Sequence, residues 1–266
     1  MKTNNDLVSV IIPCFNAEKF IAETIQSTLD QTYPNIEIIV VDDGSTDNSF
    51  KIASSFSDVI VLSQNNAGVA SARNNGFNHS KGSYVCFLDA DDWLYPTTIY
   101  DKLNALLSSK AAIAHGQVIV TDETLTPTGA TLLGAREDTL KALLNYSPPA
   151  IPCPSNALIA RWAIERCGLF DTNLSTSADY DMWLRIAMKY NVVRVDTMAV
   201  KYRQHGTNMF SNLELQLHDM ELVFEKYKLE LDLKIVKRKF YTSLVKSYLR
   251  SGKIFDALKY SYKLLK

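Results

Sequence analysis

Along the first 110 residues, continuous apolar runs alternate with stretches in which apolar side chains recur every three or four positions. The runs are rich in Val and Ile and predict strands buried on both faces, at residues 7–15, 36–43, 58–64 and 83–91. The stretches that follow each run predict helices, at residues 18–31, 45–56, 68–80 and 96–109. This alternation predicts an α/β protein with a mostly parallel sheet and helices on both faces.

After residue 110 the pattern loosens. It predicts a strand at 111–123, a loop or hairpin at 124–138, a proline-rich connection into a strand at 146–160, a helix at 178–190 and a short strand at 192–196. From Asn212 onward only helical spacing is found, with Gly252 as a C-cap between two amphipathic helices. We therefore expect two parts, an α/β domain over residues 1–211 and a helical appendage over residues 212–266.

Composition narrows the classes of function. With 28 Lys or Arg against 29 Asp or Glu, the chain has no excess of positive charge for binding nucleic acid. Its four cysteines, at positions 14, 86, 153 and 167, lack metal-site spacing. No apolar stretch reaches the ~18 residues of a membrane-spanning helix, and the first residues lack the apolar core of a signal peptide. These features predict a cytoplasmic protein.

The charge is unevenly distributed along the chain. Residues 226–266 contain twelve Lys or Arg and three Asp or Glu, so a basic tail follows an acidic body. Basic amphipathic helices of this kind can lie on the anionic inner face of a cell membrane. They can also pack on the preceding domain or on a second copy of the chain, and the sequence leaves these alternatives open.

Three carboxylates crowd the end of the fourth predicted strand, in the segment "FLDADD". Because alternate residues of a strand face the same side, Asp89 and Asp91 are expected to project together. Oxygen ligands in this arrangement suit Mg²⁺ or Mn²⁺, which keep open positions for phosphate groups. Asp92 is expected to cap the next helix or to help the chain turn.

Polar residues also follow the second and third predicted strands. Asp42 and Asp43, in "VDDGSTD", are either ordinary turn residues or acceptors for a nucleoside N–H or hydroxyl. Gly68 would allow a ligand to approach the backbone closely, and Arg73 carries a guanidinium suited to phosphate. Because ligands of parallel sheets bind outside the carboxyl ends of the strands, we expect these residues to share one site.

Several segments between residues 7 and 210 occur together in a recognisable order: "VSVIIPCFNAEKF", "VDDGSTDNS", "NNAGVASARNNG", "SYVCFLDADD", "DYDMWLR" and "YRQHGTN". In this combination the chain resembles the inverting glycosyltransferases of family 2, which have the GT-A fold. The resemblance implies a Rossmann-like GT-A domain that binds a nucleotide-diphosphate sugar, usually a UDP sugar, together with Mn²⁺ or Mg²⁺. The residues beyond Asn212 lie outside it.

The resemblance also implies roles for individual residues. The implied donor-binding residues are Pro13, Phe15, Asn16, Asp42, Asp43, Asn66, Gly68, Arg73, Asp89 and Ala90. Those from the first two strand ends would line the uracil and ribose, and Arg73 would approach the diphosphate. Asp89, Asp91 and His205 are the implied metal ligands, although His205 could equally be a hydrogen-bonded structural residue.

A proton acceptor is implied just before the helix predicted at 178–190. The family has a Glu-Asp pair at this point, and Asp179 matches the Asp, whereas Ala178 stands in place of the Glu. We therefore expect Asp179 to deprotonate the acceptor hydroxyl. Asp181 is the rival candidate, with the alternative role of an acidic residue stabilising the helix N-terminus.

These inferences together predict a metal-dependent, inverting glycosyltransferase. It would move a sugar to a hydroxyl of a glycan, lipid-linked or protein-linked acceptor in the synthesis of cell-surface polysaccharide or glycoconjugate. A sugar nucleotidyltransferase should have a glycine-rich basic loop near the first strand, and a dehydrogenase should have G-x-G-x-x-G; neither is present. A non-catalytic, transferase-like scaffold would fit Ala178, but the other carboxylates of the implied site are intact.

Overall fold

The computed structural model describes residues 6–146, 148–206 and 212–264. The strands are β1 Val8–Cys14, β2 Ile36–Asp42, β3 Val59–Ser63, β4 Tyr84–Phe87, β5 Trp93–Leu94, β6 Ile113–Thr121, β7 Pro127–Leu132, β8 Ala157–Ala160 and β9 Val192–Arg203. The α-helices are α1 Ile21–Leu29, α2 Ser49–Ala53, α3 Val69–His79, α4 Thr98–Ser109, α5 Thr139–Asn145, α6 Arg161–Cys167, α7 Ala178–Ala187, α8 Leu213–Tyr227, α9 Lys234–Arg250 and α10 Ile254–Ser261.

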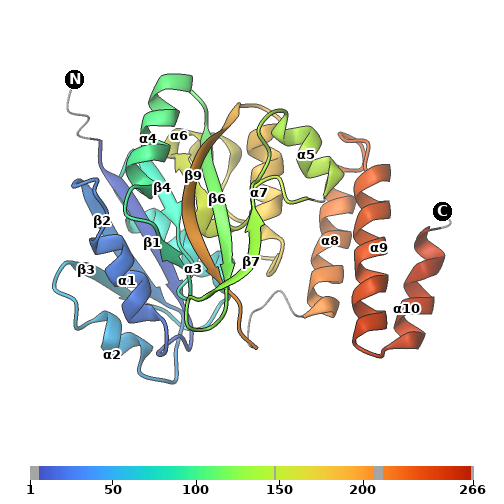
Figure 1. The fold of residues 1–266 in the computed structure, drawn as a ribbon, viewed down its shortest axis with the longest axis horizontal. Coiled ribbons are helices and arrows are strands. Elements are labelled where there is room, and N and C mark those ends of the chain that lie inside the picture. Colours follow the sequence, from blue (N-terminus) through green and yellow to red (C-terminus); the bar gives the residue numbers. More distant parts are fainter. Residues whose placement is uncertain (1–5, 147, 207–211, 265–266) are drawn as a thin grey trace.

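These strands form one sheet with helices packed on both faces (Figure 1). The sheet order is β3-β2-β1-β4-β8-β6-β9-β5, with β7 paired to β6. The strands β1 to β4 are parallel to one another, and β8 then pairs antiparallel with β4. The predicted α/β class, with a mostly parallel sheet, flanking helices and a helical C-terminal part, is confirmed.

The buried strands supply a core on each face of the sheet. Along β1, Ile11 packs with the cluster that contains α3 and α7, whereas its neighbours Val10 and Ile12 pack with α1 and α4. Alternate residues of a strand point to opposite faces, so a strand covered on both sides must be apolar throughout. This explains why the first strands read as continuous apolar runs.

A glycine allows α3 to lie against β1. A Cβ atom at Gly76 would come within 2.3 Å of Ile11 Cγ2, a distance that packed carbon atoms do not reach. Any side chain at this position would therefore push α3 away from the sheet. The close approach fixes the helix that carries Arg73 over the carboxyl end of β1.

Some local predictions differ from the structure. The helix expected over 45–56 shrinks to the five residues of α2, and the residues before it lie in a loop, where Thr46 N–H donates to Asn16 Oδ1 at 2.8 Å. β9 is 12 residues long, more than twice the predicted strand, because it pairs with both β6 and β5. The short helices α5 and α6 were not predicted.

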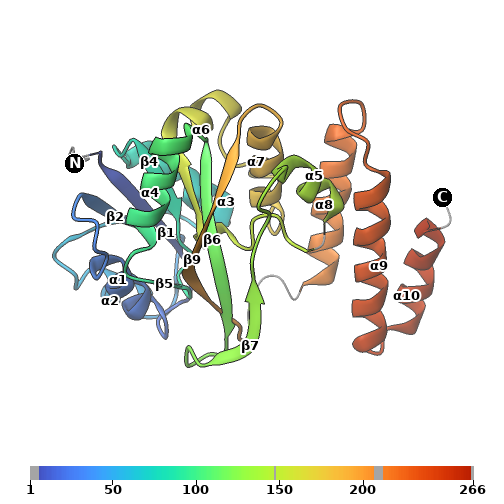
Figure 2. The same cartoon turned by 45° about the horizontal axis from the view of Figure 1, so that its top comes forward.

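The C-terminal helices stand at one side of the sheet, beside α5 and α7, as Figure 2 also shows. Their inner residues, among them Phe224 and Phe240, belong to the same core cluster as Met182 of α7. The predicted boundary between residues 211 and 212 adjoins 207–211, which lie outside the described residues. Within the described ranges, no helix is both long and apolar enough to cross a membrane.

A buried carboxylate of α8 holds the loop that leads into α7. Asp219 is fully buried, and its Oδ2 atom accepts backbone N–H bonds from Ser175 at 2.8 Å, Thr176 at 2.6 Å and Ser177 at 3.1 Å. The negative charge also lies at the N-terminus of α7, where the helix dipole favours it. Asp219 therefore fixes where α7 begins.

A second carboxylate joins the same two helices. Asp181 of α7 is fully buried, and it accepts from Arg185 Nε at 2.9 Å and from the Tyr227 hydroxyl at 2.8 Å. Lys226 Nζ lies 2.8 Å from its Oδ1 atom. The Oδ1 atom of Asp181 thus attaches α7 to α8, and its Oδ2 atom is used by Arg185 within α7.

We predict that Asp219→Ala lowers the free energy of unfolding by about 3 kcal/mol, because it leaves backbone N–H groups of residues 175–177 without their buried acceptor. Urea unfolding followed by circular dichroism measures this. Asp58→Ala, at an exposed position, is the control and should stay within about 0.5 kcal/mol of the wild type. Equal stability of both variants would contradict the anchoring role of Asp219.

Candidate functional site

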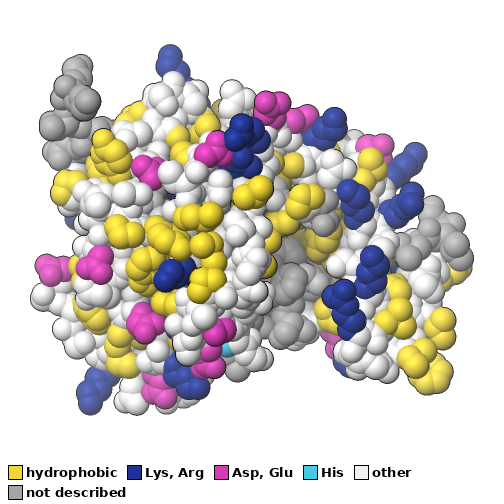
Figure 3. Space-filling view, viewed as in Figure 1, with side chains coloured by type: hydrophobic (Ala, Val, Ile, Leu, Met, Phe, Trp, Pro, Cys, Tyr) yellow, Lys and Arg dark blue, Asp and Glu magenta, His cyan; other side chains and the backbone are white. Residues whose placement is uncertain are grey.

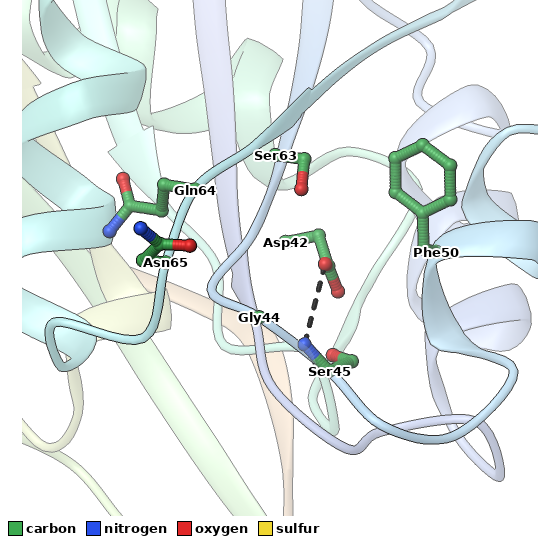
Figure 4. Close-up of a pocket in the computed structure, with 7 residues that line it drawn as sticks. All are labelled: Asp42, Gly44, Ser45, Phe50, Ser63, Gln64 and Asn65. Atoms are coloured by element: carbon green, nitrogen blue, oxygen red, sulfur yellow. Dashed lines mark hydrogen bonds between the residues drawn. The ribbon is translucent and has the colours of Figure 1, made fainter.

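The polar residues that follow β1, β2, β3 and β4 gather at the carboxyl edge of the parallel strands. Beside β2 and β3 this edge is hollowed by an open pocket of about 650 Å³ (Figure 4). Its lining residues are Asp42, Gly44, Ser45, Phe50, Ser63, Gln64 and Asn65. The pocket combines an exposed aromatic ring with hydroxyl, amide and carboxylate groups, a mixture that suits a flat polar ring such as a nucleobase.

Asp42 provides the carboxylate of this pocket. The residue is buried, its Oδ2 atom accepts a long hydrogen bond of 3.4 Å from Ser45 N–H, and its Oδ1 atom has no hydrogen-bond partner among the described residues. A buried oxygen without a partner is unfavourable unless a ligand or water supplies a donor. Asp42 is therefore the best-placed acceptor for a ligand N–H in the pocket.

The neighbouring Asp43 is already engaged. Its carboxylate accepts from Gln64 Nε2 at 2.8 Å, from Ala67 N–H at 2.9 Å and from Gly68 N–H at 2.8 Å. These bonds shape the loop before α3, in which Asn66 is exposed and Gly68 has a φ of 88° that favours glycine. Of the two implied nucleoside-binding carboxylates, the geometry favours Asp42 over Asp43.

The residues implied at the end of β1 differ in whether their side chains are exposed or hold the local structure together. Phe15 is half exposed beside the loop, whereas Pro13 is buried in the strand. Asn16 has a φ of 50°, and its N–H donates to Ser45 Oγ at 3.0 Å, so it ties the β1–α1 loop to the β2–α2 loop. Phe15 is thus the member of this group that is free to stack on a ring.

The segment 88–92 is a turn, which corrects the expectation that Asp89 and Asp91 alternate along a strand. β4 ends at Phe87, and Asp92 N–H donates to the Asp89 carbonyl at 3.1 Å. Ala90 is buried, with its carbonyl accepting from Thr24 Oγ1 at 2.9 Å, and its implied contact with the donor stays a prediction. The three carboxylates therefore diverge from the turn.

Each carboxylate of the turn has its own partners. Asp89 Oδ1 pairs with Arg73 Nη2 at 2.6 Å, and Asp91 Oδ2 lies 2.8 Å from His205 Nε2. Asp92 is fully buried and accepts from Ser155 Oγ at 2.5 Å and from Arg203 N–H at 3.1 Å. Burial, and then the neighbouring carboxylates of Asp91 and Asp89, raises the pKa of Asp92 well above its usual range.

The residues that hold the turn were missed by sequence reasoning. Ser155, in the proline-rich connection, also accepts a bond from Asp89 N–H at 3.0 Å. Arg203 is buried, and it donates to the Asp91 carbonyl at 2.8 Å and to Glu23 Oε2 at 2.7 Å. The only sequence signal for Arg203 is its place two residues before His205, and Ser155 has none.

Asp91 and His205 suit a divalent ion that takes few ligands from the protein. Two ligands at right angles, each about 2.1 Å from one ion, lie about 3 Å apart, close to the separation of these two atoms. The His205 ring is oriented by stacking on Phe20, with ring centroids 4.8 Å apart. No cluster of three or more Asp, Glu, His or Cys side chains suited to a metal occurs among the described residues, so the remaining ligands would be phosphate oxygens and water.

Asp89 was implied both as a metal ligand and as a donor contact. Its pairing with Arg73 separates it from the pair formed by Asp91 and His205. The Arg73 guanidinium is buried and stacks over the Phe170 ring, 5.2 Å from its centroid. Arg73 therefore acts first on Asp89, and direct contact of Arg73 with a diphosphate stays a prediction.

Asp179 lies partly buried at the start of α7, close enough to Arg73 and Asp89 for their charges to affect it. Burial raises the pKa of Asp179 to about 6, against the opposing effect of the Arg73 guanidinium and with a smaller contribution from Asp89. A carboxylate with such a pKa is a stronger base than usual and is still ionised at neutral pH. Both oxygens of the rival Asp181 are already paired, one with Arg185 of α7 and the other with α8.

Comparison with known proteins shows the family to which this chain belongs. Residues 9–168 match the model of the family described as glycosyl transferase family 2. The chain is 31% identical over 216 residues to the glucosyltransferase WfaP of Escherichia coli, covering 78% of this chain and 81% of that protein. It is 33% identical over 220 residues to an uncharacterised glycosyltransferase of Rickettsia felis, covering 77% of this chain but spanning only 36% of that relative.

Solved structures share the fold at lower identity. The structure of S. aureus TarS in complex with UDP has a TM-score of 0.61 at 17% identity and covers 98% of this chain and 92% of that one. The mannosyltransferase PcManGT of Pyrobaculum calidifontis, in complex with GDP-Man and Mn²⁺, has a TM-score of 0.64 at 18% identity and covers 98% of this chain and 76% of that one. From the family match and the relatives at over 30% identity, the chain belongs to glycosyl transferase family 2.

Proposed function

We propose that this protein is a metal-dependent, inverting glycosyltransferase that uses a UDP sugar. The observation that carries the proposal is the placement of three groups at one edge of the sheet: the Asp42 pocket, the pair formed by Asp91 and His205, and the raised-pKa carboxylate of Asp179. They correspond in order to a nucleobase site, a diphosphate site and a catalytic base that accepts a proton. A binding scaffold would have no use for a carboxyl group whose pKa is raised to about 6.

The proposed donor follows from the pocket and from the relatives. The buried Asp42 Oδ1 atom needs a donor, and the uracil ring carries an N–H that would supply one. The exposed ring of Phe15 can stack on the base from the β1 side. TarS has been solved with UDP and with UDP-GlcNAc, which supports a uridine nucleotide here.

In the proposed mechanism the hydroxyl oxygen of the acceptor attacks the anomeric carbon of the donor, and Asp179 accepts the proton of that hydroxyl. The bond from that carbon to the diphosphate breaks on the opposite side, so the configuration inverts. Arg73 keeps Asp89 neutralised beside the diphosphate, and Asp219 fixes the start of the helix that carries Asp179. A divalent ion held by Asp91 and His205 would supply positive charge for the leaving diphosphate.

The acceptor is proposed to be a lipid-linked glycan. The name of WfaP describes glucosyl transfer to an α-D-GlcNAc carried on diphosphoundecaprenol, and this relative covers most of the chain. A protein-linked or free glycan acceptor is the alternative, and a role in cell-surface polysaccharide or glycoconjugate synthesis follows from either. Action at the inner face of the cell membrane stays a prediction.

The proposal predicts that activity falls at low pH as Asp179 becomes protonated. Because a protonated carboxyl cannot accept the hydroxyl proton, kcat/KM should fall about tenfold per pH unit below pH about 6 and be flat above it. Transfer assays with saturating Mn²⁺ at each pH measure this. Asp179→Asn should lower kcat by about 10² to 10⁴ without weakening UDP binding, and an unchanged fall at low pH in Asp179→Glu and Asp179→Asn would contradict the assignment.

Removal of the metal tests the pair formed by Asp91 and His205. Donor hydrolysis by the wild type should require Mn²⁺ or Mg²⁺, stop with EDTA and return when the ion is restored. Asp91→Ala should hydrolyse the donor at least about 100-fold more slowly at the same ion concentration, since it removes one of two protein ligands. Equal turnover by wild type and Asp91→Ala would overturn the enzymatic proposal.

The nucleobase pocket gives an independent test. Asp42→Ala should weaken UDP binding in calorimetry about tenfold or more, because a buried acceptor for the base N–H is lost. Asp58→Ala, on the exposed turn before β3, is the control and should bind UDP as the wild type does. If Asp43→Ala and not Asp42→Ala lost affinity while staying folded, the nucleoside contact would belong to Asp43.

A further inference from the structure

The last two helices expose large apolar side chains that the helical bundle does not use. The exposed fractions are 89% for Phe255, 63% for Leu258, 59% for Ile254 and 54% for Leu249. The first three lie on one face of α10, and Leu249 precedes them at the end of α9. We call these four residues the apolar stripe.

The apolar stripe is separate from the surface that holds the helices together. α10 is attached through its opposite side, where Ala257 is buried and the Tyr260 ring stacks on Tyr248 with centroids 5.7 Å apart. α9 in turn packs on α8 through buried residues such as Phe240 and Leu244. The stripe therefore points away from a bundle that is already complete.

Exposed cations flank the stripe. Lys246, Arg250, Lys253 and Lys259 are all exposed, and none of them forms an ion pair with another described residue. We call these four residues the basic flank. Lys and Arg gather over the C-terminal helices, with apolar side chains at the outer edge (Figure 3).

The sign of the charge is nearly uniform over these helices. Residues 234–264 contain nine Lys or Arg and a single acidic residue, Asp256, in a chain whose net charge is −1. The rest of the protein is therefore acidic overall. An anionic surface would attract this end of the molecule and repel the remainder, so that the charge distribution sets the orientation.

We propose that the apolar stripe and the basic flank together dock on a membrane surface that contains anionic lipids. Large apolar side chains bordered by Lys and Arg are the composition that places a helix in the headgroup region. A second copy of the chain is a poorer occupant, because two basic flanks would face each other across the contact. The proposal stands on these helices alone and does not depend on the transferase activity.

Docking in this way brings the candidate site toward the lipid. The turn between α9 and α10, which carries Lys253, lies at the same end of the molecule as the carboxyl ends of β1 and β2 in both views (Figures 1 and 2). The stripe begins next to this turn, with Ile254 and Phe255 in the first turn of α10. A surface contacting the turn would thus face the edge that holds the site, where a lipid-linked acceptor could reach it.

Vesicle sedimentation of the full chain tests the proposal. The wild type should sediment with vesicles of phosphatidylglycerol and phosphatidylcholine at low salt and much less with phosphatidylcholine alone. Raising the salt from about 0.05 M to about 0.5 M should weaken binding, because the screening length falls about threefold. A wild type that does not bind, or that binds both kinds of vesicle equally, would overturn the proposal.

Matched variants locate the contact. Phe255→Asp with Leu258→Asp, and separately Arg250→Glu with Lys253→Glu, should each lower vesicle affinity at least about tenfold. The controls are Leu229→Asp, at a position 91% exposed in the connection between α8 and α9, and Lys51→Glu with Lys81→Glu on the α/β domain. All variants should keep wild-type circular dichroism and donor hydrolysis in detergent-free buffer.

Two results would contradict the placement of the membrane contact on the apolar stripe and the basic flank. If the control variants lowered vesicle binding as much as the stripe and flank variants, the attraction would be non-specific. If the wild type were a dimer in sedimentation equilibrium that Phe255→Asp made monomeric, without vesicle binding by either, the stripe would be a contact between copies.

Discussion

Repulsion among the carboxylates of Asp89, Asp91 and Asp92 is the constraint on which the rest of the site depends. The fold resolves it by giving each group a different partner: a guanidinium, an imidazole, and a hydroxyl with a backbone N–H. The partners come from α3, from Ser155 just before β8, and from Arg203 and His205 at and after the end of β9. Three distant segments must therefore meet at one turn. The crowded turn thereby organises this edge of the sheet.

The helical C-terminal part is joined to this site through α7. Asp219 of α8 accepts hydrogen bonds from the loop before α7, and Tyr227 of α8 donates one to Asp181 of α7. The position of Asp179 therefore depends on residues outside the segment that matches the family. α8 holds the helix that carries the proposed base, and α9 and α10, which pack beside α8, carry the proposed membrane-docking surface.

Much of the fold could be predicted from the sequence because strands covered on both faces must be apolar, and the first four strands were identified in this way. The site could be predicted only as a set of residues. The assumption that Asp89 and Asp91 alternate on a strand was wrong, because Ser155 and Arg203 draw the chain into a turn. Contacts between residues so far apart leave no periodic signal, and neither does the preference of the pocket for Asp42 over Asp43.

A crystal structure of the protein with UDP and Mn²⁺ tests the central claim most directly, which is that the three carboxylates of the turn have separate tasks. We predict that the ion is bound by Asp91 and His205 together with diphosphate oxygens, that Asp89 stays paired with Arg73, and that the uracil N–H donates to Asp42. An ion held by Asp89 or Asp92, or a uracil ring bound away from the Asp42 pocket, would contradict this account.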